Sequence, residues 1–578
     1  MSTRTLTILD ITGIQDYIFG SNRLRENIGA SFLVEQATSQ WLYDALPAQA
    51  HNLEVKGTAI NQESLATHAH LLAEVVYRGG GNVVVLFRSI TQARASVTTL
   101  SKRIIEEAPG LELAAAHITC DWDTCVVGGS QGKYHQLLEK LAQSKQTRRP
   151  STPLLGQSVT LECRSTGLPA VAFVNLSSED DTQKGPDILP VSAEIATKVK
   201  DSIREEADKR LQAMWPPDIT KRYRLTRQLD QLGRSHGESS YIALVHADGN
   251  NMGVRFQQII EEYDTKEQND DCIAAIRELS RSVEAAGRAA LQTTVASLIE
   301  TLNALPEDHL LKQSILIPKD TKEQAYEYYL PFRPLVFGGD DVTFVCDGRL
   351  GLRLAATYLT AFEQATQNLR GGPAYACAGV AIVKAHYPFA RAYDICEELC
   401  KNAKRMAKDV KETHGEDVSA MDWHFAISGP IGLLKDIRDR SDVPKQDDPL
   451  ADTHNRSDVP KHDRSERTQT LWMRPITLTK TPFSSWRDWK SFCHIIEKFG
   501  SPDWQERRNK LLQLQEELRK GQAATQHFLQ AFSLPPLPEL AGINKAESGT
   551  GWVRDRNGML HCAYFDAIEA LDFYPHNT

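Results

Sequence analysis

The sequence predicts an α+β fold with two ferredoxin-like domains, because the order strand, helix, strand, strand, helix, strand occurs twice along the chain. Each copy places a glycine-rich turn between its two middle strands, at residues 79–82 in the first copy and 338–341 in the second. The chain has 578 residues, which is too many for one hydrophobic core. The two copies are therefore predicted to be separate domains, joined by a connector subdomain and followed by a C-terminal helical domain.

The first ferredoxin-like domain is predicted to occupy residues 1–127, and the connector subdomain residues 128–237. Apolar runs bounded by turn residues predict strands at 5–11, 73–77, 83–87 and 111–122, and helical spacing predicts helices at 21–46 and 90–108. The connector has clusters of Pro, Gly and charged residues, with a charged helix at about 192–214.

The second ferredoxin-like domain is predicted to occupy residues 238–425. Its predicted strands lie at 241–247, 333–337, 342–346 and 374–383, and its predicted helices at 271–305, 350–370 and 388–411. Gly371, Gly372 and Pro373 end the middle helix, since glycine and proline both interrupt helices. Only this copy carries acids in its turn, so we expect catalysis in the second domain.

Residues 426–477 are predicted to be a charged, flexible linker. The hexapeptide Arg-Ser-Asp-Val-Pro-Lys occurs in it twice, at 440–445 and 456–461, and a repeat with so few apolar residues cannot form a core. The remaining residues, 478–578, are predicted to be mostly helical. Their leucine-rich stretch at 511–518 is predicted to pack in the core of this domain rather than to contact a partner protein.

The composition is that of an ordinary globular protein, with 41% hydrophobic and 24% charged residues. The formal net charge of −9 argues against a protein that coats nucleic acid, although it allows RNA binding in a local basic groove. No apolar run approaches the roughly 20 residues of a membrane span, and no signal-peptide pattern precedes the first strand. A cytoplasmic protein without membrane contact is expected.

The ten cysteines contain no Cys-x-x-Cys pair, which gives a zinc ribbon little support. Cys396 and Cys400 share one face of a predicted helix, where a pair of residues is at best half of a metal site. Buried free thiols are therefore predicted, and disulfides are not expected in the cytoplasm.

The acidic turn Gly338-Gly339-Asp340-Asp341 is the strongest candidate for a catalytic site. Paired glycines supply the positive φ of a tight hairpin and leave space for a phosphate or a metal ion. Neighbouring carboxylates repel each other unless a cation lies between them, and a divalent metal ion is the usual cation. A solvated turn is the alternative, since Asp and Gly are common turn residues.

Asp248 ends the first strand of the second domain, and in this fold the acidic hairpin pairs beside that strand. We therefore predict that Asp248, Asp340 and Asp341 are catalytic and bind metal. Asp341 is the first choice to share a metal ion with Asp248, while Asp340 joins a second metal ion or orients the attacking hydroxyl. Gly249 leaves room for the backbone to approach phosphates.

A basic helix face could neutralise a triphosphate. Lys401, Lys404, Arg405 and Lys408 fall on one face of the predicted helix at 388–411. Directed toward the acidic turn, this face would hold the β- and γ-phosphates of a nucleotide. Lys404 and Lys401 are predicted to bind the nucleotide, with Lys404 preferred. A solvated helix face is the alternative.

Several motifs together resemble a known family. In the second domain they are Ala-Asp-Gly-Asn-Asn-Met-Gly at 247–253, Phe-Gly-Gly-Asp-Asp at 337–341 and Cys-Ala-Gly-Val-Ala-Ile-Val-Lys-Ala-His-Tyr-Pro-Phe at 377–389. In the first they are Ile-Thr-Gly-Ile-Gln-Asp-Tyr-Ile-Phe at 11–19, Arg-Leu-Arg-Glu at 23–26, Gly-Ala-Ser at 29–31 and Gly-Gly-Gly-Asn at 79–82. They resemble the two Palm domains in the large subunit of type III CRISPR effector complexes, of the type III-B kind.

The resemblance implies an enzyme that joins ATP into cyclic or linear oligoadenylate messengers when an RNA-guided complex meets foreign RNA. It implies ATP at the junction of the two Palm domains, with Gly80, Gly81 and Asn82 on the side of the first. It also implies Mg²⁺ or Mn²⁺ at the acids described above. The implied partners are CRISPR RNA, target RNA and the other subunits of the effector complex.

The chain departs from the family at three places. Most relatives begin with an HD nuclease domain, whereas this chain starts directly in the first Palm domain, so cleavage of single-stranded DNA is not expected. Only Cys163 stands in the context of the family's four-cysteine element, so zinc is not expected. Asn250 stands where relatives often have a further acid, which would weaken a second metal site.

Two other functions stay open at this point. One is a scaffold subunit of an RNA-guided complex with little catalysis of its own, although a scaffold has no need to keep the acidic turn. The other is a nucleotide cyclase that acts outside such a complex.

Overall fold

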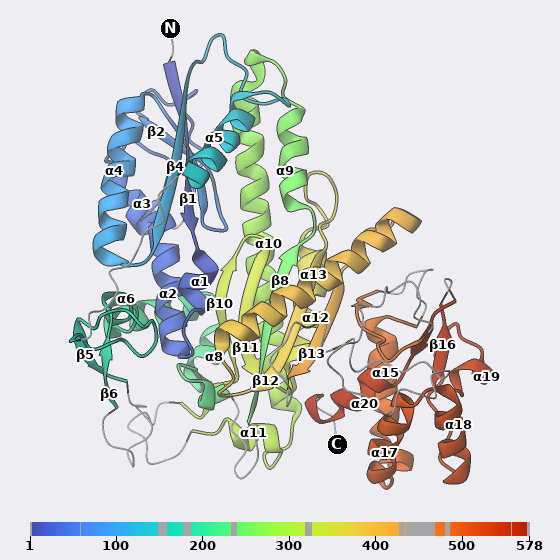
Figure 1. Ribbon diagram of the computed structural model, residues 1–578. Helices are drawn as coiled ribbons and strands as arrows, with labels where there is room; N and C mark the ends of the chain where they lie inside the picture. The colour runs from blue at the N-terminus through green and yellow to red at the C-terminus, as the bar shows by residue number, and fades with distance from the viewer. Residues whose placement is uncertain are drawn as a thin grey trace.

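The computed structural model of the protein describes residues 3–574 with these exceptions: 58, 148–158, 177–186, 233–239, 318–325, 427–433, 435–437, 439–468, 480–485 and 556–557. Both copies of the hexapeptide repeat lie outside the described residues, and so does most of the predicted linker. The predicted fold class is confirmed, because helices pack on two separate sheets that are joined by further helices (Figure 1).

The first sheet has the strand order β2-β3-β1-β4, and each neighbouring pair is antiparallel. Its strands are β1 (Thr3–Thr12), β2 (Ala73–Gly79), β3 (Asn82–Phe87) and β4 (Glu112–Asp121). The predicted ferredoxin-like chain order gives this arrangement of strands. Helix α4 (Ile90–Glu107) packs against β4, and so does α5 (Lys133–Thr147), which belongs to the predicted connector in sequence.

The single helix predicted at 21–46 is divided in two. Helix α2 (Leu24–Thr38) ends where α3 (Gln40–Ala45) begins, and α1 (Ile14–Phe19) precedes both. Ser39 separates α2 from α3 because its φ of −119° and ψ of −93° lie outside the helical region. Its hydroxyl donates a hydrogen bond to the carbonyl oxygen of Glu35, which satisfies a group at the end of α2.

The second sheet has the order β10-β11-β8-β12-β13-β15. Its ferredoxin-like part comprises β8 (Tyr241–Gly249), β10 (Phe332–Gly338), β11 (Asp341–Asp347) and β12 (Ala376–Lys384). The helices of this part are α9 (Met252–Glu261), α10 (Asn269–Ala304), α11 (Leu310–Ser314), α12 (Gly351–Ala365) and α13 (Phe389–His414). Helix α9 was not predicted, and α12 ends five residues before the predicted end at 370.

Two further strands extend this sheet beyond the predicted pattern. Strand β13 (Ala420–Ala426) pairs in parallel with β12, and β15 (Ile476–Thr477) pairs antiparallel with β13. Strand β15 lies at the end of residues 426–477, the stretch predicted to be a flexible linker, so the last residues of this stretch join the second sheet. A strand of two residues shows no periodicity in sequence, and it forms here because β13 offers a free edge.

The connector contains short elements. They are β5 (Ala172–Asn175), β6 (Ile188–Val191), α6 (Ala193–Lys198), α7 (Asp201–Gln212), α8 (Pro217–Arg222) and β7 (Tyr223–Leu225), which pairs with β9 (Tyr328–Leu330). The predicted charged helix at 192–214 is therefore two helices, α6 and α7.

The C-terminal region is mainly helical, as predicted, and it also contains a small sheet. Its helices are α15 (Trp489–Phe499), α16 (Pro502–Gln505), α17 (Arg508–Arg519), α18 (Gln522–Ala531), α19 (Lys545–Ser548) and α20 (Phe565–Ala570). The sheet comprises β14 (Gln469–Thr470), β17 (Leu560–Cys562) and β16 (Trp552–Arg554). Leu511, Leu514 and Leu518 are buried in the core, whereas Leu512 is exposed. The five domain limits stay predictions.

The two ferredoxin-like units share one interface. Helix α10 packs against β2 of the first unit and α12 of the second (Figure 1). The ring of Phe19 on α1 stacks on Tyr393 of α13 with centroids 4.1 Å apart, and the Ser31 hydroxyl on α2 donates a hydrogen bond to the carbonyl oxygen of Leu335 on β10. These contacts bring the glycine-rich turns of both units to one pocket.

Among the described residues, no helix combines the length and the apolar composition that a membrane span needs. The ten cysteines are free, and eight of them are buried. Cys396 and Cys400 are among the buried ones, and their thiols contact backbone carbonyl groups of Leu244 and Cys377. The prediction of buried thiols at this pair is confirmed.

Candidate active site

The register of the second sheet places Asp248 and the acidic hairpin together. Strand β11 runs antiparallel to β8, with Val342 opposite Ala247. One step further along this register, Asp341 lies opposite Asp248. The hairpin itself pairs Gly338 with Asp341, so that Gly339 and Asp340 form the turn, and Gly339 has a φ of 75°. A residue with a side chain rarely adopts this backbone conformation.

Two glycines hold the hairpin in place by their lack of a side chain. A Cβ atom at Gly287 on α10 would overlap the carbonyl oxygen of Gly339, so the hairpin tip rests directly on the helix backbone. A Cβ atom at Gly249 would lie 2.8 Å from the Cβ of Asp340. Gly249 therefore makes room for an aspartate side chain, whereas the sequence analysis expected it to make room for a phosphate.

One of the four predicted basic residues reaches the acids. Nζ of Lys404 on α13 lies 2.5 Å from Oδ2 of Asp248 and also donates a hydrogen bond to the carbonyl oxygen of Gly249. Lys401, the other predicted nucleotide ligand, instead pairs with Glu397 one turn earlier on the same helix. Arg405 and Lys408 pair with Asn402 and Glu412.

Asp340 and Asp341 share an environment that disfavours their charged forms. Burial, and then the negative charge of Asp248, raise the pKa of Asp340 to about 7 and that of Asp341 to about 7. The side chain of Asp341 is 36% exposed as a whole, but its Oδ1 atom is buried and has no hydrogen-bond partner among the described residues. Nδ1 of His246 lies 3.4 Å from this atom and hydrogen bonds with Thr343 instead.

The donor set suits a divalent cation in its chemistry. Mg²⁺ and Mn²⁺ prefer carboxylate oxygens, and the buried Oδ1 of Asp341 is a carboxylate oxygen without a partner. In the described part of the chain, however, no three or more His, Cys, Asp or Glu side chains lie close enough together to hold a metal ion. The Lys404 ammonium group is the cation that neutralises Asp248.

Asn250 and Cys163 are the two positions at which the sequence departs from the family's metal-binding residues, and both are partly or fully buried. The side-chain amide of Asn250 donates to the carbonyl oxygen of Val418, while its buried Oδ1 has no hydrogen-bond partner among the described residues. Cys163 is a buried free cysteine. Burial acts to raise the pKa of its thiol, but hydrogen bonds with the Thr166 hydroxyl and with backbone groups, among them that of Ser192, lower it overall.

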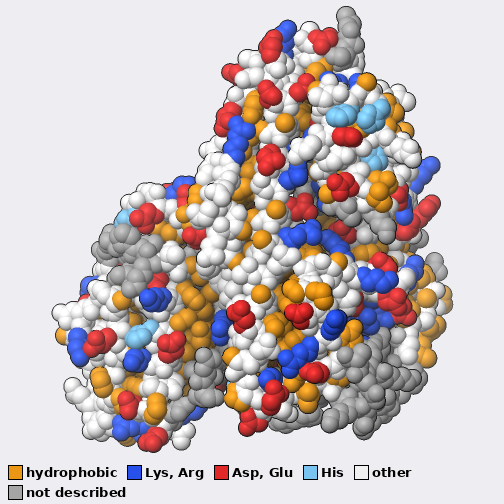
Figure 2. Space-filling model, turned by 180° about the vertical axis from the view of Figure 1, so that it is seen from behind, with side chains coloured by type: hydrophobic (Ala, Val, Ile, Leu, Met, Phe, Trp, Pro, Cys, Tyr) orange, Lys and Arg blue, Asp and Glu red, His pale blue; other side chains and the backbone are white. Residues whose placement is uncertain are grey.

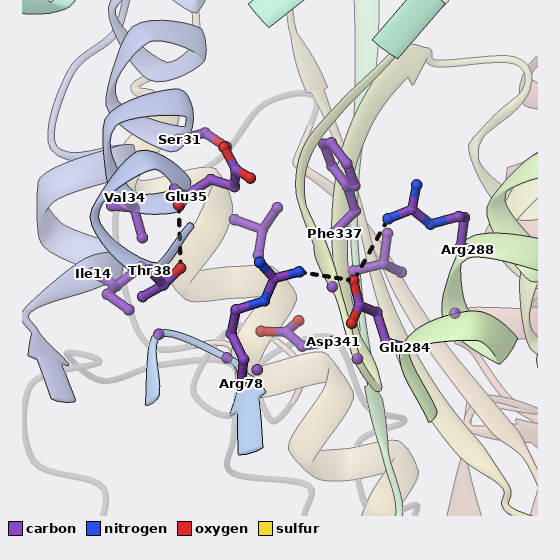
Figure 3. A pocket seen from close by; sticks show the side chains of 18 of the residues that line it. Ile14, Ser31, Val34, Glu35, Thr38, Arg78, Glu284, Arg288, Phe337 and Asp341 are labelled. Atoms are coloured by element: carbon purple, nitrogen blue, oxygen red, sulfur yellow. Dashed lines mark hydrogen bonds and ion pairs between the residues drawn. The ribbon is translucent and has the colours of Figure 1, made fainter. Parts of the chain in front are cut away.

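A pocket separates the two glycine-rich turns (Figure 3). Gly80 and Gly81 line it from the first unit, and Gly338, Gly339 and Asp341 line it from the second. Asn82 instead pairs in the first sheet, opposite both Gly79 and Asp10.

Five charged residues that line this pocket were not predicted from the sequence. They are Glu35 on α2, Arg78 on β2, Arg210 on α7, and Glu284 and Arg288 on α10. They come from four distant elements and form no motif, so only the spacing of Glu284 and Arg288 by one helical turn could have suggested a pair. On the face of the molecule seen in Figure 2, Lys and Arg side chains are mixed with Asp and Glu side chains. Binding of an anion is therefore expected to depend on basic residues within a pocket and not on a broad basic surface.

Residues 241–411 match the family model described as Cas10/Cmr2, second palm domain. The matched segment contains β8, the acidic hairpin and most of α13, and therefore all three acids and Lys404. No protein with a curated description matches the chain in sequence.

The chain is also similar to solved structures of Csm1–Csm4 cassettes. For the cassette in complex with pppApApA, the TM-score is 0.48 and the identity 12%, over 99% of this chain and 69% of the other. For the cassette in complex with AMPPNP the values are 0.47 and 13%, over 99% and 70%. For the cassette in complex with cA4 they are 0.39 and 13%, over 75% of this chain and 55% of the other. The chain thus spans little more than half the length of this last relative.

Proposed function

We propose that the protein is a metal-dependent nucleotidyltransferase that joins ATP into cyclic or linear oligoadenylate. The observation that carries the proposal is the meeting of three acids and Lys404 beside a pocket that the other unit completes with its glycine turn. This meeting falls in the segment that matches a second palm domain. Carboxylates for a cation and a lysine for phosphates are the parts that phosphoryl chemistry needs.

In the proposed reaction, the 3′-hydroxyl of one ATP attacks the α-phosphorus of the next ATP. The bond between the 3′-oxygen and phosphorus forms, the bond from phosphorus to the oxygen that bridges to the β-phosphate breaks, and pyrophosphate leaves. Asp340, at the hairpin tip, orients this hydroxyl and accepts its proton. Lys404 supplies positive charge to the leaving phosphates.

Asp248 and Asp341 are the residues that would hold a divalent cation, together with Asp340 if a second ion binds. A bound Mg²⁺ or Mn²⁺ would offset the negative charge that develops on the phosphate oxygens. Gly338, Gly339, Gly80 and Gly81 line the pocket without side chains of their own, which leaves room there for the nucleotide.

We further propose that the protein acts as a subunit of an RNA-guided type III CRISPR complex, with CRISPR RNA, target RNA and other effector subunits as partners. The match to the Cas10/Cmr2 second palm domain supports this assignment. The type III-B kind rests on the resemblance in sequence, and a cytoplasmic location is proposed from the composition of the chain.

The test is incubation of the purified chain with labelled ATP and Mn²⁺, with and without complex partners and target RNA. Oligoadenylate and pyrophosphate are expected, and the double variant Asp340→Ala/Asp341→Ala is expected to form neither. A requirement for the partners and target RNA would place the activity within a complex. Absence of product under every condition would reject the enzyme.

One observation favours a scaffold subunit as a second candidate. Asp248 is already paired with Lys404, and the described residues contain no tight group of three metal-binding side chains. A scaffold would bind its partners and RNA with no ATP turnover, and assembly would be unchanged in the double variant.

A further inference from the structure

Three arginines line the junction pocket, one from each ferredoxin-like unit and one from the connector, and each pairs with a glutamate. Oε1 of Glu284 lies 3.5 Å from Nη2 of Arg78 and 3.5 Å from Nη2 of Arg288, so that one carboxylate is shared by two guanidinium groups. Oε2 of Glu35 lies 3.1 Å from Nη1 of Arg210. Figure 3 shows Glu284 between Arg78 and Arg288, with a dashed line from its carboxylate to each guanidinium group.

The positive charges of these arginines are only partly offset. Burial lowers the pKa of Arg210. The charges of Arg288 and Arg78 act in the same direction, and those of Glu35 and Glu284 oppose it. The guanidinium groups of Arg78 and Arg288 are therefore close enough to repel that of Arg210. Among the described residues, Glu284 is the acid that pairs with both Arg78 and Arg288, so these two arginines share one counterion.

A phosphate group would match these arginines better than the shared carboxylate does. Guanidinium groups bind carboxylate and phosphate in the same forked geometry, but a terminal phosphate carries more negative charge and three acceptor oxygens. Arg78 immediately precedes the turn Gly79-Gly80-Gly81, which lines the pocket, and a Cβ atom at Gly80 would meet no other atom within 4 Å. Lys404 reaches the acids from α13, whereas the arginines come from β2, α7 and α10.

We infer that Arg78, Arg210 and Arg288 form a second phosphate subsite, and that Glu284 competes with phosphate for two of these arginines. The ligand class is the 5′-triphosphate of the nucleotide that donates its 3′-hydroxyl. This inference rests on the proposed function, because a reaction between two ATP molecules must accommodate two triphosphates. When this triphosphate binds, it replaces the Glu284 carboxylate at Arg78 and Arg288. The ion pair between Arg78 on β2 and Glu284 on α10 is then broken.

The test measures the binding of inorganic tripolyphosphate to the full chain by calorimetry, without turnover. Glu284→Gln removes the competing charge and should tighten binding about two- to fivefold, the range that a partly exposed ion pair contributes. Glu284→Asp keeps the charge and should bind as the wild type does. Arg288→Gln and Arg78→Gln should each weaken binding.

Glu262→Gln is the matched control, since Glu262 pairs with Arg370 outside the pocket lining and should leave binding unchanged. If a folded Glu284→Gln variant binds tripolyphosphate as weakly as the wild type or more weakly, the inference is overturned. The ion pair between Arg78 and Glu284 would then only connect the two units. Should Glu284→Gln fail to melt cooperatively, the two arginine variants decide, and unchanged binding in both rejects the subsite. A wild type that shows this binding pattern but forms no oligoadenylate would reject the proposed function and keep the subsite.

Discussion

Nζ of Lys404 lies 2.5 Å from Oδ2 of Asp248, so a lysine from α13 neutralises one of the three carboxylates at the end of β8 and β11. A divalent cation that binds Asp248 must compete with this ammonium group. The same ammonium group is the one best placed among the four predicted basic residues to meet a phosphate. Lys404 is therefore expected to oppose the binding of the metal ion and to favour the binding of the nucleotide.

Lys404→Met should tighten Mn²⁺ binding and weaken ATP binding. The change removes a competing charge of a partly exposed pair, so an effect of up to about fivefold on each affinity is expected. Mn²⁺ titration followed by electron paramagnetic resonance measures the first affinity, and calorimetry with ATP the second. Lys401→Met is the control, since Lys401 pairs with Glu397 and should change neither value. Parallel weakening of both affinities in Lys404→Met would contradict this account.

Gly287→Ala should displace the acidic hairpin. The added methyl group would overlap the carbonyl oxygen of Gly339, and relief requires the hairpin or α10 to move, at a cost of about 1–3 kcal/mol. Loss of oligoadenylate synthesis and a lower melting temperature are expected. Gly253→Ala, also in a helix, meets no atom within 4 Å and should preserve both properties. Full activity in Gly287→Ala would show that the hairpin does not depend on this close approach.

His424 on β13 should make the protein less stable in acid. Burial, and then the charges of Arg474 and Arg438, lower the pKa of His424 from its ordinary value near 6.5 to about 3. The unfolded chain therefore binds this proton at a pH where the folded chain does not. The contribution is complete above pH 6.5 and decreases as the pH falls toward 3, by up to about 1.4 kcal/mol per pH unit.

Urea unfolding of the wild type and of His424→Gln, followed by tryptophan fluorescence, measures this effect. The difference in unfolding free energy between the two proteins should change between pH 7.5 and pH 5 in favour of the variant. A difference that stays constant over this range would show that His424 does not titrate as described.

The ion pairs of Arg474 should contribute strongly to the stability of the C-terminal region. Its guanidinium group is fully buried, 3.4 Å from Asp566 and 3.0 Å from Glu569, and stacks on Trp472. Arg474→Met removes the nearest counterion of the buried Asp566 and of the partly buried Glu569, which is expected to cost about 3–5 kcal/mol. Chemical denaturation measures the loss.

Arg508→Met provides the contrast in the same region. Arg508 pairs with Asp572 at the surface, where such a pair contributes less than about 1 kcal/mol. Similar losses in the two variants would contradict a special role for Arg474.

The sequence predicted the acidic hairpin because its chemistry is local. Two glycines and two acids between apolar runs define a turn, and the ferredoxin-like order then fixes Asp248 as a neighbour. Helical spacing correctly placed four basic residues on one face, but it could not tell that Glu397 engages Lys401 and leaves Lys404 for Asp248.

Features made by tertiary contact alone were not predicted. Strand β15 has two residues and no pattern of its own, and it forms only because β13 offers an edge. Arg78, Arg210 and Arg288 lie far apart in sequence and meet only where β2, α7 and α10 surround the pocket. Single-sequence patterns carry no information on such meetings.

The central claim is that the acidic hairpin joins ATP molecules. Its most direct measurement is the amount of pyrophosphate and of 3′–5′ phosphodiester bonds formed from ATP and Mn²⁺ by the chain assembled with its partners and target RNA. Equal amounts of the two products from the wild type, and neither from Asp341→Asn, are the predicted result. Equal product from the wild type and Asp341→Asn, or none from either, would contradict the claim.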